Sequence, residues 1–320
     1  NGVTTAILEL LAGLGKDTFY ELVDNIEDAD VIHAHTIGLE YIKQSFKYKS
    51  KMIVSAHVVP DSFIGSLIFS ELWRPIAKWY LKFAYNRSKS VIAVSPFVKD
   101  ELQSIGVNSE INVLCNSVDR QKFVFNESER LRLRRKHQVE NDFIVVCAGQ
   151  IQPRKGIYDF IDTAKKCPNI TFVWVGGFPF KRLTADYDKL QSVVKSAPKN
   201  IIFTGIVDFK EMPSYYTMAD AFFMPSYQET FGYATIEAAS CRCPVLLRDN
   251  VEYNDFFFNH YLKGQTADDF AQIITKLKDD NNFYSHWQDE AEILATRYSQ
   301  KEYMKQLKTL YLDLLPNSAE

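Results

Sequence analysis

Two acidic and two basic side chains have the types and the spacing to bind a phosphorylated sugar. Glu229 and Glu237 lie in one stretch, PSYQETFGYATIEAASCRCP, at positions 225–244, with seven residues between them. Arg154 and Lys155 stand together in a separate loop, directly before a glycine. Carboxylates accept hydrogen bonds from hydroxyl groups, whereas fixed positive charges bind a diphosphate and neutralise the charge that develops as it leaves. These residues therefore predict half of a nucleotide-sugar site.

The elements around the acidic stretch would place both glutamates near a helix N-terminus. An apolar strand over residues 221–225 precedes Glu229, and Thr230, Phe231 and Gly232 then open a helix. A helix N-terminus suits a phosphate, because it presents unpaired backbone N–H groups and a partial positive charge. The alternative is one exposed carboxylate and one on a helix surface, which is the usual fate of glutamate. Apolar residues interleaved with the glutamates favour the functional interpretation.

The basic pair belongs to another predicted strand-to-helix loop. A buried strand over residues 143–149 is followed by Gln150, Arg154 and Lys155, and then by an amphipathic helix over residues 157–166. Taken alone, such a pair is weak evidence, because basic pairs are common on solvated loops. Its value comes from the acidic stretch on a neighbouring strand of the same half of the chain.

Short apolar runs alternate with helical stretches along the chain. They cover residues 31–36, 51–57, 90–95, 143–149, 170–175, 201–203, 221–224 and 244–247. This alternation is typical of βαβ units and hence of parallel sheets that are covered on both faces. We expect an α/β protein with two Rossmann-like domains facing a cleft, and with its ligands at the carboxyl ends of the strands.

The expected domains are an acceptor domain, a nucleotide-sugar domain and a C-terminal helix that crosses back to the first domain and packs across both. They cover residues 1–118, 119–295 and 296–320, respectively. A long helical pattern extends over residues 283–315. At the other end, Gly2 runs directly into a helical pattern over residues 6–14, so the first strand expected of a Rossmann-like domain is missing from the numbered chain.

Three histidines fall at the ends of the first predicted strands. His33 and His35 are two residues apart, which puts both rings on one side of a strand and would also suit a metal. Packing and hydrogen bonding are the more common roles of such a pair, and no third ligand is visible at a suitable spacing. For His57, a role in the cleft and a structural role both remain open.

Residues 63–85 mix tryptophan, tyrosine and phenylalanine with Arg74, Lys78 and Lys82. Such a mixture suits a helix at a membrane surface, with aromatic rings at headgroup depth and cations toward anionic lipid. The same pattern would serve an ordinary helix packed on a sheet. Pro75 predicts a break or a first turn nearby.

The arginine-rich segment at residues 129–136 invites a nucleic-acid or lipid-headgroup interpretation. We prefer a solvated helix face with Leu131 and Leu133 turned inward.

The totals set limits on the class of protein. The chain has 320 residues, 46% of them hydrophobic, and a net charge of only −3. Two domains fit this length, and the charge gives no argument for a nucleic-acid partner. Five scattered cysteines favour a reducing compartment, and no apolar run approaches the ~18 residues that would cross a bilayer. We expect a soluble cytoplasmic protein, in one variant resting on the inner face of the membrane.

Taken together, the motifs resemble the retaining glycosyltransferases of family 4, which have the GT-B fold. The resemblance is carried, in order, by DVIHAHT, His57, the NSVD linker at residues 116–119, the PRKG loop and PSYQETFGYATIEA. Within that family, GQIQPRKG, FVWVGGFPF, IIFTGIV and PVLLRD look most like bacterial enzymes that add glucose or galactose to diacylglycerol or to monoglycosyl-diacylglycerol. Two departures are Gln150, where many members have arginine, and Ser117, where glycine is usual.

The resemblance implies a role for each candidate residue. Arg154 and Lys155 would hold the donor diphosphate with Gln150 nearby, Glu237 the ribose and Glu229 the hydroxyls of the transferred sugar. The remaining candidates are the amides around Thr230, Phe231 and Gly232 for the donor, Gly2 near the phosphates, His57 beside the sugar as a catalytic residue, and His33, His35 and Asp61 on the acceptor side.

The activity implied is transfer of a hexose from a UDP-sugar to a lipid acceptor, with retention at the anomeric carbon. The acceptor hydroxyl would attack from the leaving-group face while the departing phosphate takes the proton, so that no protein nucleophile, metal or cofactor is required. The alternatives are a soluble or polysaccharide acceptor, a nucleotide-sugar epimerase of the same fold and a non-catalytic binding module. Intact Lys155, Glu229 and Glu237 argue against the last of these.

Overall fold

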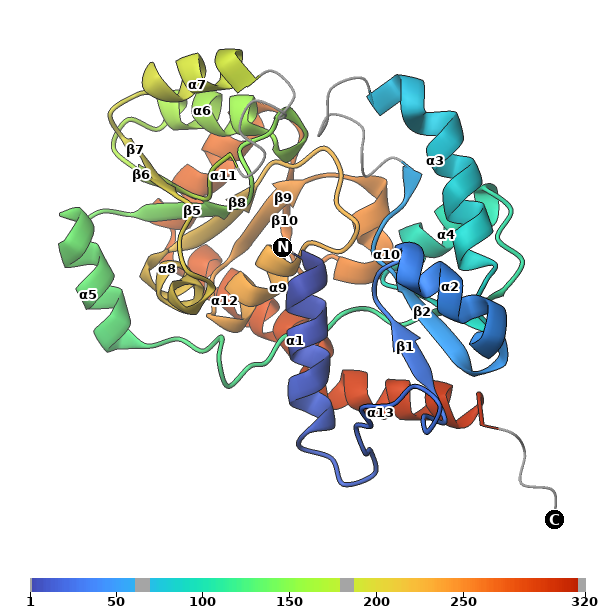
Figure 1. Ribbon diagram of the computed structural model, residues 1–320. Helices are drawn as coiled ribbons and strands as arrows, with labels where there is room; N and C mark the ends of the chain where they lie inside the picture. Colours follow the sequence, from blue (N-terminus) through green and yellow to red (C-terminus); the bar gives the residue numbers. More distant parts are fainter. Residues whose placement is uncertain (1, 61–69, 179–186, 316–320) are drawn as a thin grey trace. The chain divides into compact units, whose positions relative to one another are not determined.

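The chain folds into two compact α/β units. The computed structural model describes residues 2–60, 70–178 and 187–315 (Figure 1). The first unit contains the chain up to Asp119 together with the C-terminal segment from Tyr298, and the second unit contains Arg120–Arg297. The polypeptide thus passes between the units at two points. At these points Val118 N donates a hydrogen bond to Tyr298 O at 2.9 Å.

The first unit is built on a parallel sheet in the order β1-β2-β3-β4. The strands are β1 (Ile32–Ala34), β2 (Met52–Ala56), β3 (Ser90–Ala93) and β4 (Glu110–Val113). The three apolar runs predicted in this half are strands, and β2 and β3 are wholly buried. Strand β4 was not predicted, because it is an edge strand with no continuous apolar run: Glu110 and Val113 are exposed.

Helices surround this sheet, and the last helix of the chain joins its core. They are α1 (Gly2–Leu14), α2 (Leu39–Tyr48), α3 (Ser70–Tyr85), α4 (Pro96–Ser104) and α13 (Gln300–Leu312), with the short 3₁₀ turn η1 (Lys49–Lys51). Leu14 of α1 and Leu307 of α13 share a buried cluster with Ile53 of β2. A Cβ on Gly13 would lie 2.6 Å from Met304 Sδ, so glycine permits the close approach of α1 and α13.

Two details of the predicted helices are wrong. The pattern over residues 283–315 is not one helix: it is α12 (Asn281–Arg297) in the second unit and α13 in the first, separated where the chain passes between units. In addition, α3 continues through Pro75, where a break was expected.

The second unit contains a six-stranded parallel sheet in the order β10-β9-β8-β5-β6-β7. The strands are β5 (Ile144–Ala148), β6 (Thr171–Val175), β7 (Ile201–Gly205), β8 (Ala221–Met224), β9 (Val245–Arg248) and β10 (Leu262–Gly264). Five of the six were predicted, and only the three-residue β10 was missed. The direction of winding reverses between β5 and β8, and in open α/β sheets ligands bind at the carboxyl ends of the strands flanking such a reversal.

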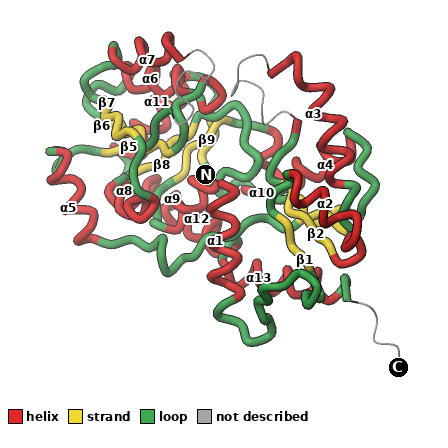
Figure 2. The backbone as a smooth tube through the Cα atoms, viewed as in Figure 1, coloured by secondary structure: helices red, strands yellow, loops and turns green. Residues whose placement is uncertain are grey.

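Helices cover both faces of this sheet (Figure 2). On one side α6 (Ile157–Lys166) packs on α11 (Ala267–Asp279), and α7 (Tyr187–Lys195) lies beside them. On the other side α5 (Glu127–His137) packs on α8 (Met212–Met218), and α9 (Tyr233–Ser240) packs on α12. The shorter elements are α10 (Asn254–Phe257), η3 (Pro153–Lys155), η5 (Phe209–Glu211) and η6 (Val251–Tyr253).

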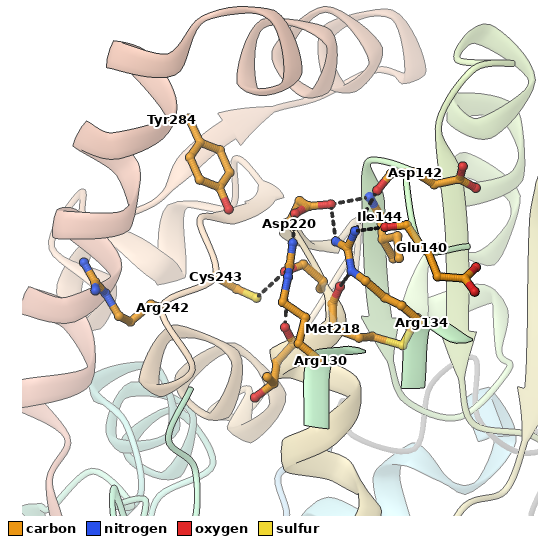
Figure 3. A network of polar contacts seen from close by, with 12 residues as sticks. Arg130, Arg134, Glu140, Asp142, Ile144, Met218, Asp220, Arg242, Cys243 and Tyr284 are labelled. Atoms are coloured by element: carbon orange, nitrogen blue, oxygen red, sulfur yellow. Dashed lines mark hydrogen bonds and ion pairs between the residues drawn. The ribbon is translucent and has the colours of Figure 1, made fainter. Parts of the chain in front are cut away.

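The arginine-rich helix α5 differs from its prediction. Leu133 is buried, but Leu131 is 42% exposed, and Arg130 and Arg134 turn inward instead to share the carboxylate of Asp220 (Figure 3). Arg134 Nη2 lies 2.7 Å from Asp220 Oδ2, which also accepts a hydrogen bond from the backbone of Ile144 at 2.7 Å. The arginines at positions i and i+4 therefore anchor α5 to the amino ends of β5 and β8.

Candidate donor site

The two predicted donor loops lie against each other at the reversal of the second sheet. The loop after β5 forms η3 and then turns at Gly156, which has a left-handed φ of +75°. A Cβ at Gly156 would lie 2.2 Å from Pro225 O, so only glycine permits this approach to the loop after β8. Arg154 O accepts a hydrogen bond from Tyr227 N at 2.9 Å, and Arg154 Nη1 donates to Gln228 O at 2.6 Å.

Lys155 and Glu229 form an ion pair across this junction. Lys155 Nζ lies 2.5 Å from Glu229 Oε1, and the two side chains are 17% and 7% exposed. Burial raises the pKa of the Glu229 carboxyl, but the charges of Lys155 and Arg154 outweigh it and hold that pKa below its ordinary value. Burial lowers the pKa of the Lys155 ammonium, and Glu229 opposes this change. The pairing was not predicted, because the two residues were given separate ligands.

The second glutamate, Glu237, lies in α9 and is 4% exposed. Its Oε2 accepts a hydrogen bond from the hydroxyl of Tyr216 at 2.7 Å. The helix begins at Tyr233, after an N-cap at Gly232 with φ +79°. Of the residues expected at the opening of this helix, Phe231 has a buried side chain.

Arg248 was missed as a residue of this region. It lies at the carboxyl end of β9, donates from Nε to Pro225 O at 3.1 Å, and approaches Asp159 Oδ2 to 2.9 Å. Its guanidinium also lies over the ring of Tyr227, 4.0 Å from the centroid. Arg248 therefore holds the loop after β8 in place. The signal was present in PVLLRD, since a cation that ends a buried strand follows the rule that had singled out the histidines.

Gln150, the residue with arginine in its place in many family members, is held by its neighbour. Gln152 Nε2 donates to Gln150 Oε1 at 2.8 Å, and Gln152 is buried. This bond orients the Gln150 amide within the loop after β5.

In the first unit, the three predicted histidines come together at the carboxyl ends of β1 and β2. His33 Nε2 lies 2.8 Å from Ser55 Oγ and its Nδ1 lies 2.6 Å from the Tyr311 hydroxyl. His35 Nδ1 lies 3.0 Å from His57 Nε2, and the His35 ring stacks on both other imidazoles.

Burial keeps these histidines neutral. It lowers the pKa of His35 to about 4 and, with the charge of His35, the pKa of His57 to about 3. The pKa of His33 lies well below its ordinary value for the same reasons. Hydrogen bonding, the preferred interpretation of the His33–His35 pair, is what the structure shows. No cluster of three or more metal-ligating side chains is found within the described ranges.

Two candidates remain without structural support for a site role. Gly2 is the first residue of α1 and is exposed. Asp61 lies outside the described residues.

Comparison with known families identifies the class of protein. The model of glycosyl transferases group 1 matches residues 129–293, and the model of glycosyltransferase family 4 matches residues 1–122. The chain belongs to this family of glycosyltransferases, and the resemblance predicted from its motifs is confirmed.

Its curated relatives narrow the similarity further. The chain is 32% identical to the alpha-galactosylglucosyldiacylglycerol synthase of Streptococcus pneumoniae (strain ATCC BAA-255 / R6), over 100% of this chain and 86% of that protein. It is 31% identical to the processive diacylglycerol alpha-glucosyltransferase of Acholeplasma laidlawii, over 78% of this chain and 75% of the relative.

Solved structures show the same fold. HepE of Anabaena, in complex with UDP-glucose, has a TM-score of 0.74 and 19% identity, covering 89% of this chain and 79% of its own. Sucrose-phosphate synthase from Thermosynechococcus elongatus has a TM-score of 0.76 and 19% identity, covering 89% and 73%. The predicted GT-B fold is therefore confirmed.

Proposed function

We propose that this protein transfers a hexose, glucose or galactose, from a UDP-sugar to a lipid acceptor such as diacylglycerol or monoglycosyl-diacylglycerol. The observation that carries the proposal is the junction of the two donor loops, where Arg154, Lys155 and Glu229 meet at the reversal of the second sheet. The names of the relatives support a diacylglycerol-type acceptor, since both describe enzymes of glycosyl-diacylglycerol synthesis.

The donor would be held by groups of opposite charge. Arg154 and Lys155 supply the cations for the diphosphate, and α9 directs its N-terminus to the same junction. Glu229 keeps acceptor capacity despite its bond to Lys155, because an ionised carboxylate has about four lone-pair sites. It can therefore receive sugar hydroxyls while Lys155 fixes its position. Glu237 would receive the ribose hydroxyls.

The reaction would proceed with retention and without a cofactor or metal ion as part of the protein. The acceptor hydroxyl attacks from the face that the diphosphate leaves, and the departing phosphate oxygen takes its proton. Arg154 and Lys155 neutralise the charge that develops on the diphosphate, which is the task a divalent cation would otherwise perform. His57 is neutral and would contact the transferred sugar as a hydrogen-bonding group.

Helix α3 offers a surface for the membrane that holds the acceptor. Ile76, Trp79 and Phe83 form an exposed apolar stripe, with Trp79 67% exposed and stacked on Phe83. Lys78 and Lys82 are exposed beside it. An apolar stripe flanked by cations is typical of a helix that lies in the headgroup region of an anionic leaflet. None of the described helices is long and apolar enough to span a bilayer. We therefore propose peripheral contact with the inner face of the cytoplasmic membrane.

The test is a panel of UDP-sugars incubated with diacylglycerol or monoglycosyl-diacylglycerol vesicles, with the products identified by mass. Transfer of one hexose to either lipid is the expected result. Transfer only to soluble glycans, or conversion of the donor to its epimer, would replace the proposal by one of its alternatives. Release of UDP without acceptor would indicate hydrolysis.

A further inference from the structure

Tyr216 lies behind the proposed ribose-binding carboxylate and contacts it directly. Its hydroxyl donates to Glu237 Oε2 at 2.7 Å, from α8 to α9, and the tyrosine is 1% exposed. The ring is held between Phe123 and Phe222, with centroids at 6.1 and 5.9 Å. The hydroxyl therefore has a fixed position, set by packing within the second unit.

A fixed donor has two effects on a buried carboxylate. It compensates part of the cost of removing the charge from water, and it selects one rotamer among those open to a glutamate. Because burial and the Glu237 carboxylate raise the pKa of Tyr216 well above its ordinary value, the hydroxyl keeps its proton. Oε2 therefore receives a hydrogen bond at any physiological pH.

We propose that Tyr216 is a positioning residue, which holds the Glu237 carboxylate in the orientation that receives the ribose hydroxyls of the donor. This inference rests on the proposed function of Glu237 and extends it to specificity. A preoriented acceptor discriminates strongly against a ligand that lacks the matching hydroxyls, because the acceptor is then left unpaired. Tyr216 would thus determine how strongly the site prefers a ribonucleotide.

The experiment combines a variant with an altered ligand. Binding of UDP and of 2′,3′-dideoxy-UDP is measured by calorimetry for the wild type, Tyr216→Phe and Tyr215→Phe. Tyr215 is a matched control: it is a neighbour on α8, also buried, whose hydroxyl lies 3.4 Å from His137 Nε2 instead. The wild type should prefer UDP by about tenfold or more, as expected for hydrogen bonds to a charged acceptor.

In Tyr216→Phe, UDP should bind about tenfold more weakly while dideoxy-UDP binds as before, so that the preference is largely lost. Tyr215→Phe should keep the wild-type preference. An unchanged preference in Tyr216→Phe, or equal weakening of both ligands, would overturn the positioning role, because a purely structural role affects the two ligands alike.

Glu237→Gln separates this inference from the function on which it rests. If Glu237→Gln loses the preference and Tyr216→Phe keeps it, only the role of Tyr216 is wrong. If Glu237→Gln keeps the preference, the ribose contact and the role of Tyr216 are both overturned. Thermal unfolding of each variant confirms that the fold is retained.

Discussion

The polar groups of the two units solve different problems by different means. In the second unit they are charged and paired: Lys155 with Glu229, and Arg248 with Asp159. In the first unit the histidines at the strand ends are neutral and stacked. Charge suits a diphosphate, whereas neutral rings suit an uncharged sugar or lipid. The contrast indicates that donor binding is mainly electrostatic and that the first unit contributes shape and hydrogen bonds.

The largest expected effect comes from breaking the charged pair. Lys155→Ala removes a diphosphate contact and leaves the buried Glu229 without its ammonium partner. UDP affinity should fall about a hundredfold, and the free energy of unfolding by about 3 kcal/mol, because an unpaired buried charge is costly. Calorimetry with UDP and urea unfolding measure the two effects.

The control for this variant is Lys165→Ala, which breaks an exposed ion pair with Asp162 at 2.8 Å. Exposed pairs contribute little, so neither measurement should change noticeably. UDP affinity that survives Lys155→Ala would remove the diphosphate role of this lysine.

The next effect separates binding from transfer. In Glu229→Gln, the sugar hydroxyls lose a charged acceptor, while Lys155 and Arg154 remain available to the diphosphate. Transfer should fall by about tenfold or more, whereas UDP should bind at least as tightly as before. Initial rates with the UDP-hexose, compared with UDP calorimetry, give the answer, and full activity would refute the sugar contact.

The contrast between units also explains what the sequence could predict. The strands of both sheets follow from continuous apolar runs, and the donor residues follow from loops with local signatures. The Lys155–Glu229 contact could not be derived, because it depends on β8 lying next to β5, and strand order within a parallel sheet is not written in periodicity. Tyr216 was assigned no role for a similar reason, since its partner lies on a different helix.

Predictions based on one local pattern failed where a tertiary contact decided the outcome. Arg130 and Arg134 resembled a solvated face until Asp220 appeared beside them. The helical pattern over residues 283–315 shows no breaker such as Gly or Pro near Tyr298, yet the chain leaves the second unit there. Both cases show local propensity overridden by long-range packing.

A smaller effect concerns the neutral histidines. The unfolded chain takes up a proton at each histidine near pH 6.5, but folded His35 and His57 do so only near about 4 and 3. The unfolded state therefore binds more protons between these values. The free energy of unfolding should be highest above about pH 7 and should fall as the pH decreases, by up to about 1.4 kcal/mol per pH unit for each histidine.

Urea unfolding at pH 7 and pH 5 tests this dependence. His57→Gln should show a weaker loss of stability at pH 5 than the wild type, whereas His286→Gln, at an exposed position of α12, should match the wild type. An unchanged pH dependence in His57→Gln would mean that this imidazole is not held neutral by burial.

The smallest effect concerns the surfaces of the two units. Trp79 on α3 and Ile206 in the second unit are both large exposed apolar residues, at 67% and 72%. If the first unit carries the membrane contact, Trp79→Ser should reduce co-sedimentation with anionic vesicles at low salt by about tenfold, in line with the loss of one buried apolar side chain. Ile206→Ser should leave it unchanged, because no cationic stripe accompanies that position in the same helix. Equal losses in both variants would show that vesicle binding reflects general stickiness, and absence of the wild type from the pellet would count against the membrane contact itself.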